Sequence, residues 1–229
     1  MNDHTVRAYD AELEIIGRKI AEMGGIAERM LAQSMDALVR LDVELAARVV
    51  QSDSRLDELQ RELEEQAVLT IARRQPMAVD LRELVGAIHI AGDLERTGDL
   101  AKNIAKRVIK IASDPRHPRA IVGLKHMGEL AAIQLKDVLD AYAQRDVERA
   151  RSVWRRDAEI DALEDSVFRD LLTFMMEDPR NISFCTHLLF CSKNLERVGD
   201  HATNIAETIH FIYTGVTMPL ERPRGNYEA

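Results

Sequence analysis

Two segments of this chain carry acidic side chains four residues apart, and the segments resemble each other closely. Glu95 and Asp99 lie in Leu-Glu-Arg-Thr-Gly-Asp, and Glu196 and Asp200 lie in Leu-Glu-Arg-Val-Gly-Asp in the second half of the chain. Residues four apart share one face of an α-helix, with Cβ atoms about 5–6 Å apart. Two carboxylates at that spacing repel each other unless a cation or a basic side chain lies between them. The spacing therefore indicates a site for positive charge.

A second pair of acidic residues accompanies each of these segments. All four acids of the first half recur as acids in the second half, whereas neighbouring surface positions differ, as at Glu58 and Ala162. Oxygen ligands without a regular His or Cys set favour iron, manganese, magnesium or calcium, and they allow zinc. The eight predicted metal ligands are Asp53, Asp57, Glu95, Asp99, Asp157, Asp161, Glu196 and Asp200.

Other residues of these segments admit two interpretations each. Gly98 and Gly199 lie inside the acidic pairs, and a glycine within a helix costs about 1 kcal/mol relative to alanine. Their retention in both halves indicates a close approach, either of a neighbouring helix or of a metal cluster. Arg96 and Arg197 either support the acids of a metal site or form ordinary surface salt bridges. A single Glu-x-x-x-Asp occurs by chance on solvated helices, but its duplication favours metal binding.

Two polar signals lie further along the same segments. Asn103 and Asn204 follow the acidic pairs, where each could supply another oxygen ligand or a helix–helix hydrogen bond. Glu207-x-x-His210 has the spacing of a di-iron helix motif, but it has no counterpart in the first half. A ferritin-like site requires two such motifs and two further glutamates, so this interpretation is disfavoured. The sequence shows no phosphate-binding glycine loop and no nucleophile–base pair, and we predict no catalytic residues.

The composition predicts the elements that carry these residues. Hydrophobic residues make up 46% of the chain, charged residues 31% and aromatic residues 4%, which is typical of a helical bundle. Apolar residues recur at three- and four-residue intervals, as along Leu84, Ala87, Ala91 and Leu94. The formal charge of −8 argues against a nucleic-acid partner. We therefore expect an all-α protein.

Location follows from what the sequence lacks. No apolar run is long enough for a membrane span, and the first residues do not form a signal peptide. We therefore expect a cytoplasmic protein that meets the membrane only through partners. Cys185 and Cys191 are expected to be buried, reduced thiols.

The duplication extends over nearly the whole chain and predicts three helices in each copy. Asp42 and Asp146 occupy matching N-cap positions. The predicted helices cover residues 11–41, 43–73 and 79–112, and then 120–144, 147–177 and 182–213. A proline-containing linker at 113–118 separates the copies. The predicted domains are therefore 8–113 and 119–214, each a three-helix bundle, followed by a flexible tail at 215–229.

The segments 94–105 and 195–206, within this duplicated three-helix unit, closely resemble the PhoU family. The resemblance implies six long helices in two bundles side by side. It also implies multinuclear metal clusters, of iron, zinc, manganese or magnesium, on the eight acidic residues named above. No other cofactor is implied.

The resemblance further implies a regulatory function. Members of the family act as negative regulators of the bacterial phosphate-starvation (Pho) response and control phosphate uptake and homeostasis. Expected partners are the ATPase subunit of the phosphate ABC transporter and the sensor histidine kinase of the two-component system. The two long apolar bundles also favour a homodimer.

Two other hypotheses compete with a non-enzymatic adaptor. One is a carboxylate-bridged metalloenzyme, either a ferritin-like oxidase or a phosphoesterase that uses two metals. The other is a metal-free helical oligomerisation module. Elemental analysis of the purified chain separates the metal-free module from the other two.

Overall fold

The computed structural model describes residues 3–113 and 120–219, and all regular structure in these residues is helical. The predicted all-α fold is confirmed. The predicted linker and most of the predicted tail lie outside the described residues. The helices are α1 (Asp3–Arg40), α2 (Val43–Arg74), α3 (Val79–Ile111), α4 (Ala120–Gln144), α5 (Val147–Arg155), α6 (Asp157–Glu177) and α7 (Ile182–Thr214), with a short 3-10 helix at Pro179–Asn181.

The turn between the first two helices is built in the same way in both halves. The backbone N–H of Leu45 donates to the Asp42 carboxylate at 2.9 Å, and that of Arg149 donates to the Asp146 carboxylate at 2.9 Å. The residue before each cap, Leu41 or Arg145, has a positive φ. Both predicted N-caps are confirmed, and each supplies an acceptor to a free helix N-terminus.

The expected single helix at 147–177 is wrong, because Arg156 interrupts it between α5 and α6. The Arg156 carbonyl accepts a hydrogen bond from the Gln134 side-chain amide of α4 at 3.1 Å, and its guanidinium bonds Asp137 of α4 at 2.5 Å. These contacts hold Arg156 against α4. The matching helix of the first half, α2, continues without a break.

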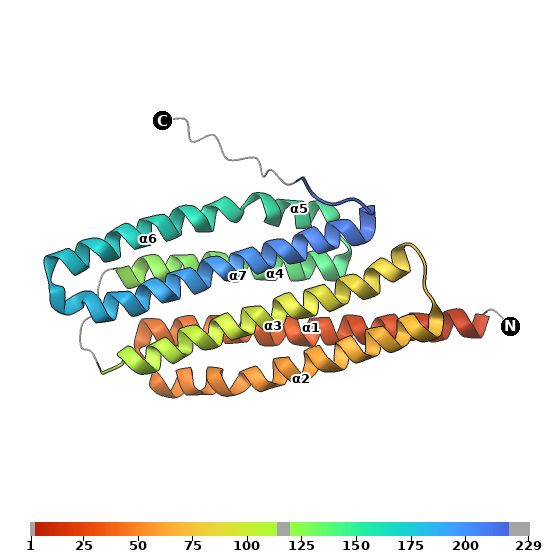
Figure 1. Cartoon of the computed structure of the whole chain (residues 1–229), viewed down its shortest axis with the longest axis horizontal. Coiled ribbons are helices and arrows are strands. Elements are labelled where there is room, and N and C mark those ends of the chain that lie inside the picture. The colour runs from red at the N-terminus through yellow and green to blue at the C-terminus, as the bar shows by residue number, and fades with distance from the viewer. Residues whose placement is uncertain (1–2, 114–119, 220–229) are drawn as a thin grey trace.

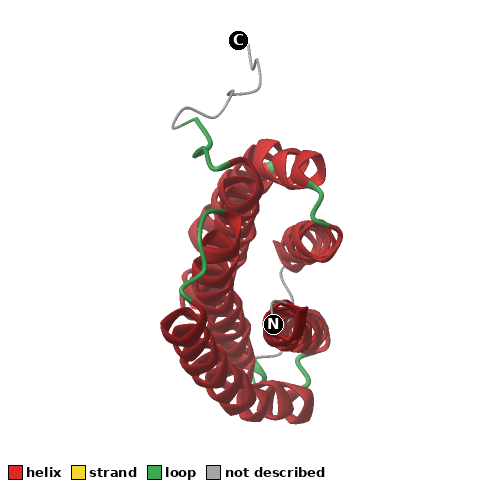
Figure 2. Cartoon of the chain, turned by 90° about the vertical axis from the view of Figure 1, so that its right-hand side faces the viewer, coloured by secondary structure: helices red, strands yellow, loops and turns green. Residues whose placement is uncertain are grey.

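The helices form two layers, as Figures 1 and 2 show. α3 and α7 lie side by side in one layer and run in opposite directions, with α2 beside α3 and with α5 and α6 beside α7. α1 and α4 form the second layer, behind α3 and α7. One continuous apolar core lies between the layers and extends through both halves.

Contacts between α3 and α7 hold the two halves together along their whole length. Arg82 donates to the Ile212 carbonyl at 2.9 Å at one end, and the Arg107 guanidinium lies 4.2 Å from the centre of the Phe190 ring at the other. Between them, the Asp93 carboxylate meets the His201 ring at 2.9 Å and accepts from Asn204 at 3.3 Å. Asn204 thus makes the helix–helix hydrogen bond that was one of its two interpretations.

These contacts form the α3–α7 seam, and Gly86 of α3 provides a test of it. A Cβ on Gly86 would overlap with the side chain of Ile212 of α7, whose Cγ1 would lie 2.7 Å away. Gly86→Ala should lower the free energy of unfolding by about 1–2 kcal/mol through overpacking. Gly17→Ala is the matched control, since a Cβ at Gly17 meets nothing within 4 Å. It should raise stability by up to about 1 kcal/mol. Urea unfolding of both variants measures the difference, and a stabilised Gly86→Ala variant would contradict the packing.

Candidate metal centres

The eight predicted ligands form two separate groups, one in each half of the chain. The first carboxylate cluster lies between α2 and α3, and the second lies between α6 and α7, so the α3–α7 seam separates them. The first cluster contains Asp53, Asp57, Glu95 and Asp99, and the second contains Asp157, Asp161, Glu196 and Asp200. Acids of different halves are not brought together in one cluster.

Both clusters lie on helices that approach closely at a glycine. A Cβ on Gly98 would overlap with Leu56 of α2, and a Cβ on Gly199 would lie 3.0 Å from Ile160 of α6. Leu56 lies in the sequence between the acids at positions 53 and 57 of α2. Ile160 lies in the same way between the acids at positions 157 and 161 of α6. The glycines therefore serve helix packing, and that packing brings the acids of the two helices together.

Basic side chains neutralise much of the first cluster. The Lys102 ammonium donates to both the Asp53 and the Asp99 carboxylates. The Arg96 guanidinium lies 3.4 Å from Glu95 and 3.8 Å from Asp99. Burial, and then repulsion from Asp99, raise the pKa of Glu95 in spite of Arg96. The positively charged side-chain group of Lys102 thus already lies between an acid of α2 and an acid of α3.

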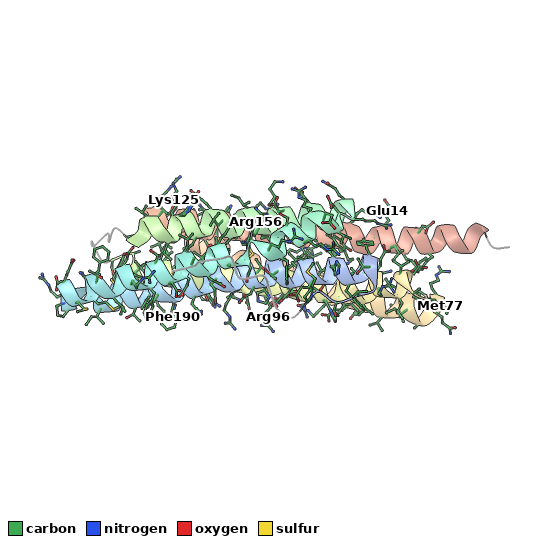
Figure 3. All side chains as sticks on the ribbon, turned by 90° about the horizontal axis from the view of Figure 1, so that it is seen from above. Glu14, Met77, Arg96, Lys125, Arg156 and Phe190 are labelled. Atoms are coloured by element: carbon green, nitrogen blue, oxygen red, sulfur yellow. The ribbon has the colours of Figure 1, made fainter. Side chains whose placement is uncertain are left out.

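Arg96 lies on the face of the molecule that is formed by α3 and α7. Figure 3 shows Arg96 of α3 and Phe190 of α7 on one face, with Lys125 of α4 and Glu14 of α1 on the opposite face. The side chain of Arg96 is 65% exposed, so its ion pairs with the acids contribute little to stability.

The second cluster holds its positive charge at a different position. Thr203 occupies the position that matches Lys102, and its hydroxyl donates to the buried Asp157 at 2.9 Å. Lys193 pairs with Glu196 at 2.8 Å, but the other oxygen of Glu196 is buried without a hydrogen-bond partner. Burial, and then repulsion from Glu196, raise the pKa of Asp200. The same two causes raise the pKa of Asp161.

The donor set suits a hard cation, but the side chains are not yet arranged around one. Within residues 3–113 and 120–219, no three His, Cys, Asp or Glu side chains are already grouped as ligands of one ion. The unpartnered oxygen of Glu196 and the raised carboxyl pKa values at the second cluster show where positive charge would be stabilised. Carboxylates would have to rotate toward an ion to hold it.

Glu207 and His210 do not form part of either cluster. Glu207 accepts a hydrogen bond from the Trp154 indole at 3.0 Å, and His210 is buried with Nδ1 unpartnered. Trp154 itself is buried.

One buried polar residue at the second cluster was missed by the sequence analysis. Gln134 of α4 is 2% exposed, and its side-chain oxygen would lie 3.4 Å from a Cβ on Gly199. Its signal in the sequence is a polar residue on an apolar stripe that includes Met127, Ala131 and Val138. The matching residue of the first half is Met30, which is apolar.

The raised pKa of Asp200 predicts a pH-dependent stability in the presence of a chelator. Because the folded pKa lies above the ordinary value of 3.8, the stabilisation is present in acid and is lost as pH rises through the folded pKa. Asp200→Asn removes the charge that causes this loss. The variant should therefore unfold at a higher urea concentration than the wild type at neutral pH, and the difference should vanish near pH 4. An equal difference at both pH values would contradict the assigned repulsion.

Comparison with known proteins agrees with this architecture. The chain matches the family model described as the PhoU domain over residues 20–108 and 124–209. It is similar to a "Phosphate-specific transport system accessory protein PhoU homolog" of Rhizobium meliloti, with 57% identity covering 96% of this chain and 93% of the relative. A protein of the same description from Caulobacter vibrioides is 50% identical, covering 98% and 97% of the two chains.

Solved structures give the same result. The crystal structure of PhoU from Pseudomonas aeruginosa matches with a TM-score of 0.88 and 36% identity, covering 91% of this chain and all of that one. A "phosphate transport system regulatory protein PhoU" from Streptococcus pneumoniae matches with a TM-score of 0.85 and 26% identity, covering 93% of this chain.

The chain therefore belongs to the PhoU family, which consists of regulatory accessory proteins and not of enzymes. The metalloenzyme hypothesis is set aside on this ground. Among the described helices, none is both long and apolar enough to cross a membrane.

Proposed function

We propose that this chain is an accessory protein of the phosphate transport system that acts in the cytoplasm as a negative regulator of the phosphate-starvation response. The single observation that carries the proposal is the similarity, over nearly the full length of both chains, to relatives named as accessory proteins of that system. Its proposed partners are the ATPase subunit of the transporter and the sensor histidine kinase, and its proposed assembly is a homodimer.

The two carboxylate clusters are the proposed metal-binding elements of this adaptor. The eight acids named above would hold hard cations, which supply positive charge and open coordination positions when bound. Raised carboxyl pKa values and the buried, unpartnered oxygen of Glu196 support this proposal. A cation held there could bind an acidic side chain of a partner or a phosphate oxygen.

Elemental analysis of a double variant tests the metal assignment. Glu196→Ala with Asp200→Ala should reduce the bound metal per chain while the helical circular dichroism remains near that of the wild type, because the glycine contact and the apolar core are unchanged. Glu58→Ala with Glu62→Ala is the matched control, since these exposed glutamates of α2 also lie four apart and pair only with basic side chains. It should keep the wild-type metal content. Unchanged metal in the cluster variant would refute the assignment, and a metal-free wild type would favour the oligomerisation module.

A cellular measurement tests the regulatory role. Deletion of the gene should raise expression from a phosphate-starvation promoter in phosphate-rich medium, and the wild-type chain should restore repression. The cluster variant should restore less repression than the Glu58→Ala, Glu62→Ala control at equal protein level. Full repression in the deletion strain would contradict negative regulation.

A further inference from the structure

The side-chain amide of Gln134 has a fixed orientation in the core between α4, α6 and α7. Its Nε2 donates to the backbone carbonyl of Arg156 at 3.1 Å. A carbonyl oxygen can only accept, so the nitrogen must face Arg156 and the side-chain oxygen must face the other way. The interruption between α5 and α6 at Arg156 makes this contact possible.

The oxygen of Gln134 faces the second carboxylate cluster from its buried side. It would lie 3.4 Å from a Cβ on Gly199, and an Asp157 oxygen would lie 3.9 Å from the same point. Gly199 separates Glu196 from Asp200 on α7. The Gln134 oxygen is buried and has no hydrogen-bond partner. Buried polar atoms are nearly always paired, so this oxygen requires a donor or a cation.

Among the described residues no side chain donates to this oxygen, although the Nε–H of Arg156 is also buried without a partner. The Thr203 hydroxyl has a single proton and donates it to Asp157 at 2.9 Å. The oxygen of Glu196 that is buried without a partner can only accept when the carboxylate is ionised. Two unpartnered oxygens of different helices thus border the same cluster.

The first cluster lacks the buried amide oxygen and has a cation of its own. Met30 replaces Gln134, and its terminal methyl would lie 3.7 Å from a Cβ on Gly98. Lys102 replaces Thr203, and its ammonium contacts both Asp53 and Asp99. The first cluster therefore contains a cation that joins acids of two helices, and none of its described oxygens is buried without a partner. In the second, Lys193 forms a salt bridge with Glu196 only, and two buried oxygens remain unpartnered.

We propose that the two clusters are unequal cation sites: the second binds a hard divalent ion with Gln134 as a neutral oxygen ligand, and in the first Lys102 takes the place of the ion. The inference rests on the proposed metal binding but restricts it to the second cluster, so that the four acids of the first cluster have Lys102 in place of an ion. Carboxylate and amide oxygens without thiolate or imidazole favour ions such as Mn²⁺.

Titration of Mn²⁺ into the chelator-treated full chain tests the role of Gln134. Gln134→Met introduces the residue of the first half and should weaken Mn²⁺ binding at least tenfold, with helical content retained. Gln134→Glu keeps an oxygen at the same place and should bind at least as tightly as the wild type. Met30→Gln is the matched control in the first half and should leave the affinity unchanged. Wild-type affinity in Gln134→Met would overturn the role of Gln134, even if Gln134→Glu fails to fold.

Substitution of Lys102 tests the inequality of the clusters. Lys102→Thr should create additional Mn²⁺ binding per chain, because the first cluster then resembles the second. Lys106→Thr removes an exposed lysine one turn further along α3 and should add none. Unchanged stoichiometry in Lys102→Thr would overturn the proposed role of Lys102.

Two further results separate this inference from the proposed function. Glu95→Ala with Asp99→Ala should leave Mn²⁺ binding unchanged in the wild-type background, whereas Glu196→Ala with Asp200→Ala should abolish it. If both double variants lose equal amounts of Mn²⁺, the inequality is refuted while metal binding stands. If the wild type binds no Mn²⁺, both the inequality and the metal assignment are refuted.

Discussion

Repulsion between carboxylates on adjacent helices is the constraint to which the rest of the structure responds. Close packing at Gly98 and Gly199 brings α2 to α3 and α6 to α7, and the same packing brings like charges together. Each half must then supply a counter-charge or tolerate carboxyl groups whose pKa is raised. Both halves do some of each. The first half supplies Lys102 and keeps Glu95 with a raised pKa. The second supplies Lys193 beside Glu196, while burial and then repulsion raise the pKa of Asp161 and Asp200.

The duplication therefore preserves the acids but not their surroundings. Substitutions at two positions, Met30 against Gln134 and Lys102 against Thr203, change the number of orphaned oxygens and the place of the positive charge at the two clusters. Two sites that look alike in their carboxylates are thus expected to differ in what they bind.

The sequence predicts the helices and their caps because these depend on local features. The apolar period and the N-caps Asp42 and Asp146 place most boundaries within a few residues of those observed. The repeat identifies the eight acids but leaves open whether the two pairs of one copy or pairs of both copies converge, because that depends on how the helices pack. The interruption at Arg156 does not follow from the repeat, because it depends on hydrogen bonds to Gln134 and Asp137 of another helix. The contact of Lys102 with acids of two helices likewise becomes visible only after packing.

The antiparallel seam has a consequence for recognition. Because α3 and α7 are related by the internal repeat and run in opposite directions, the two clusters flank the seam in a nearly two-fold arrangement. The ammonium of Lys102 between two acids on one side, and the buried, unpartnered oxygens of Glu196 and Gln134 on the other, break that symmetry chemically. A partner that spans the seam would then meet a surface with a distinct left and right, and its orientation would be selected by charge even though the backbone offers two almost equivalent ways to bind.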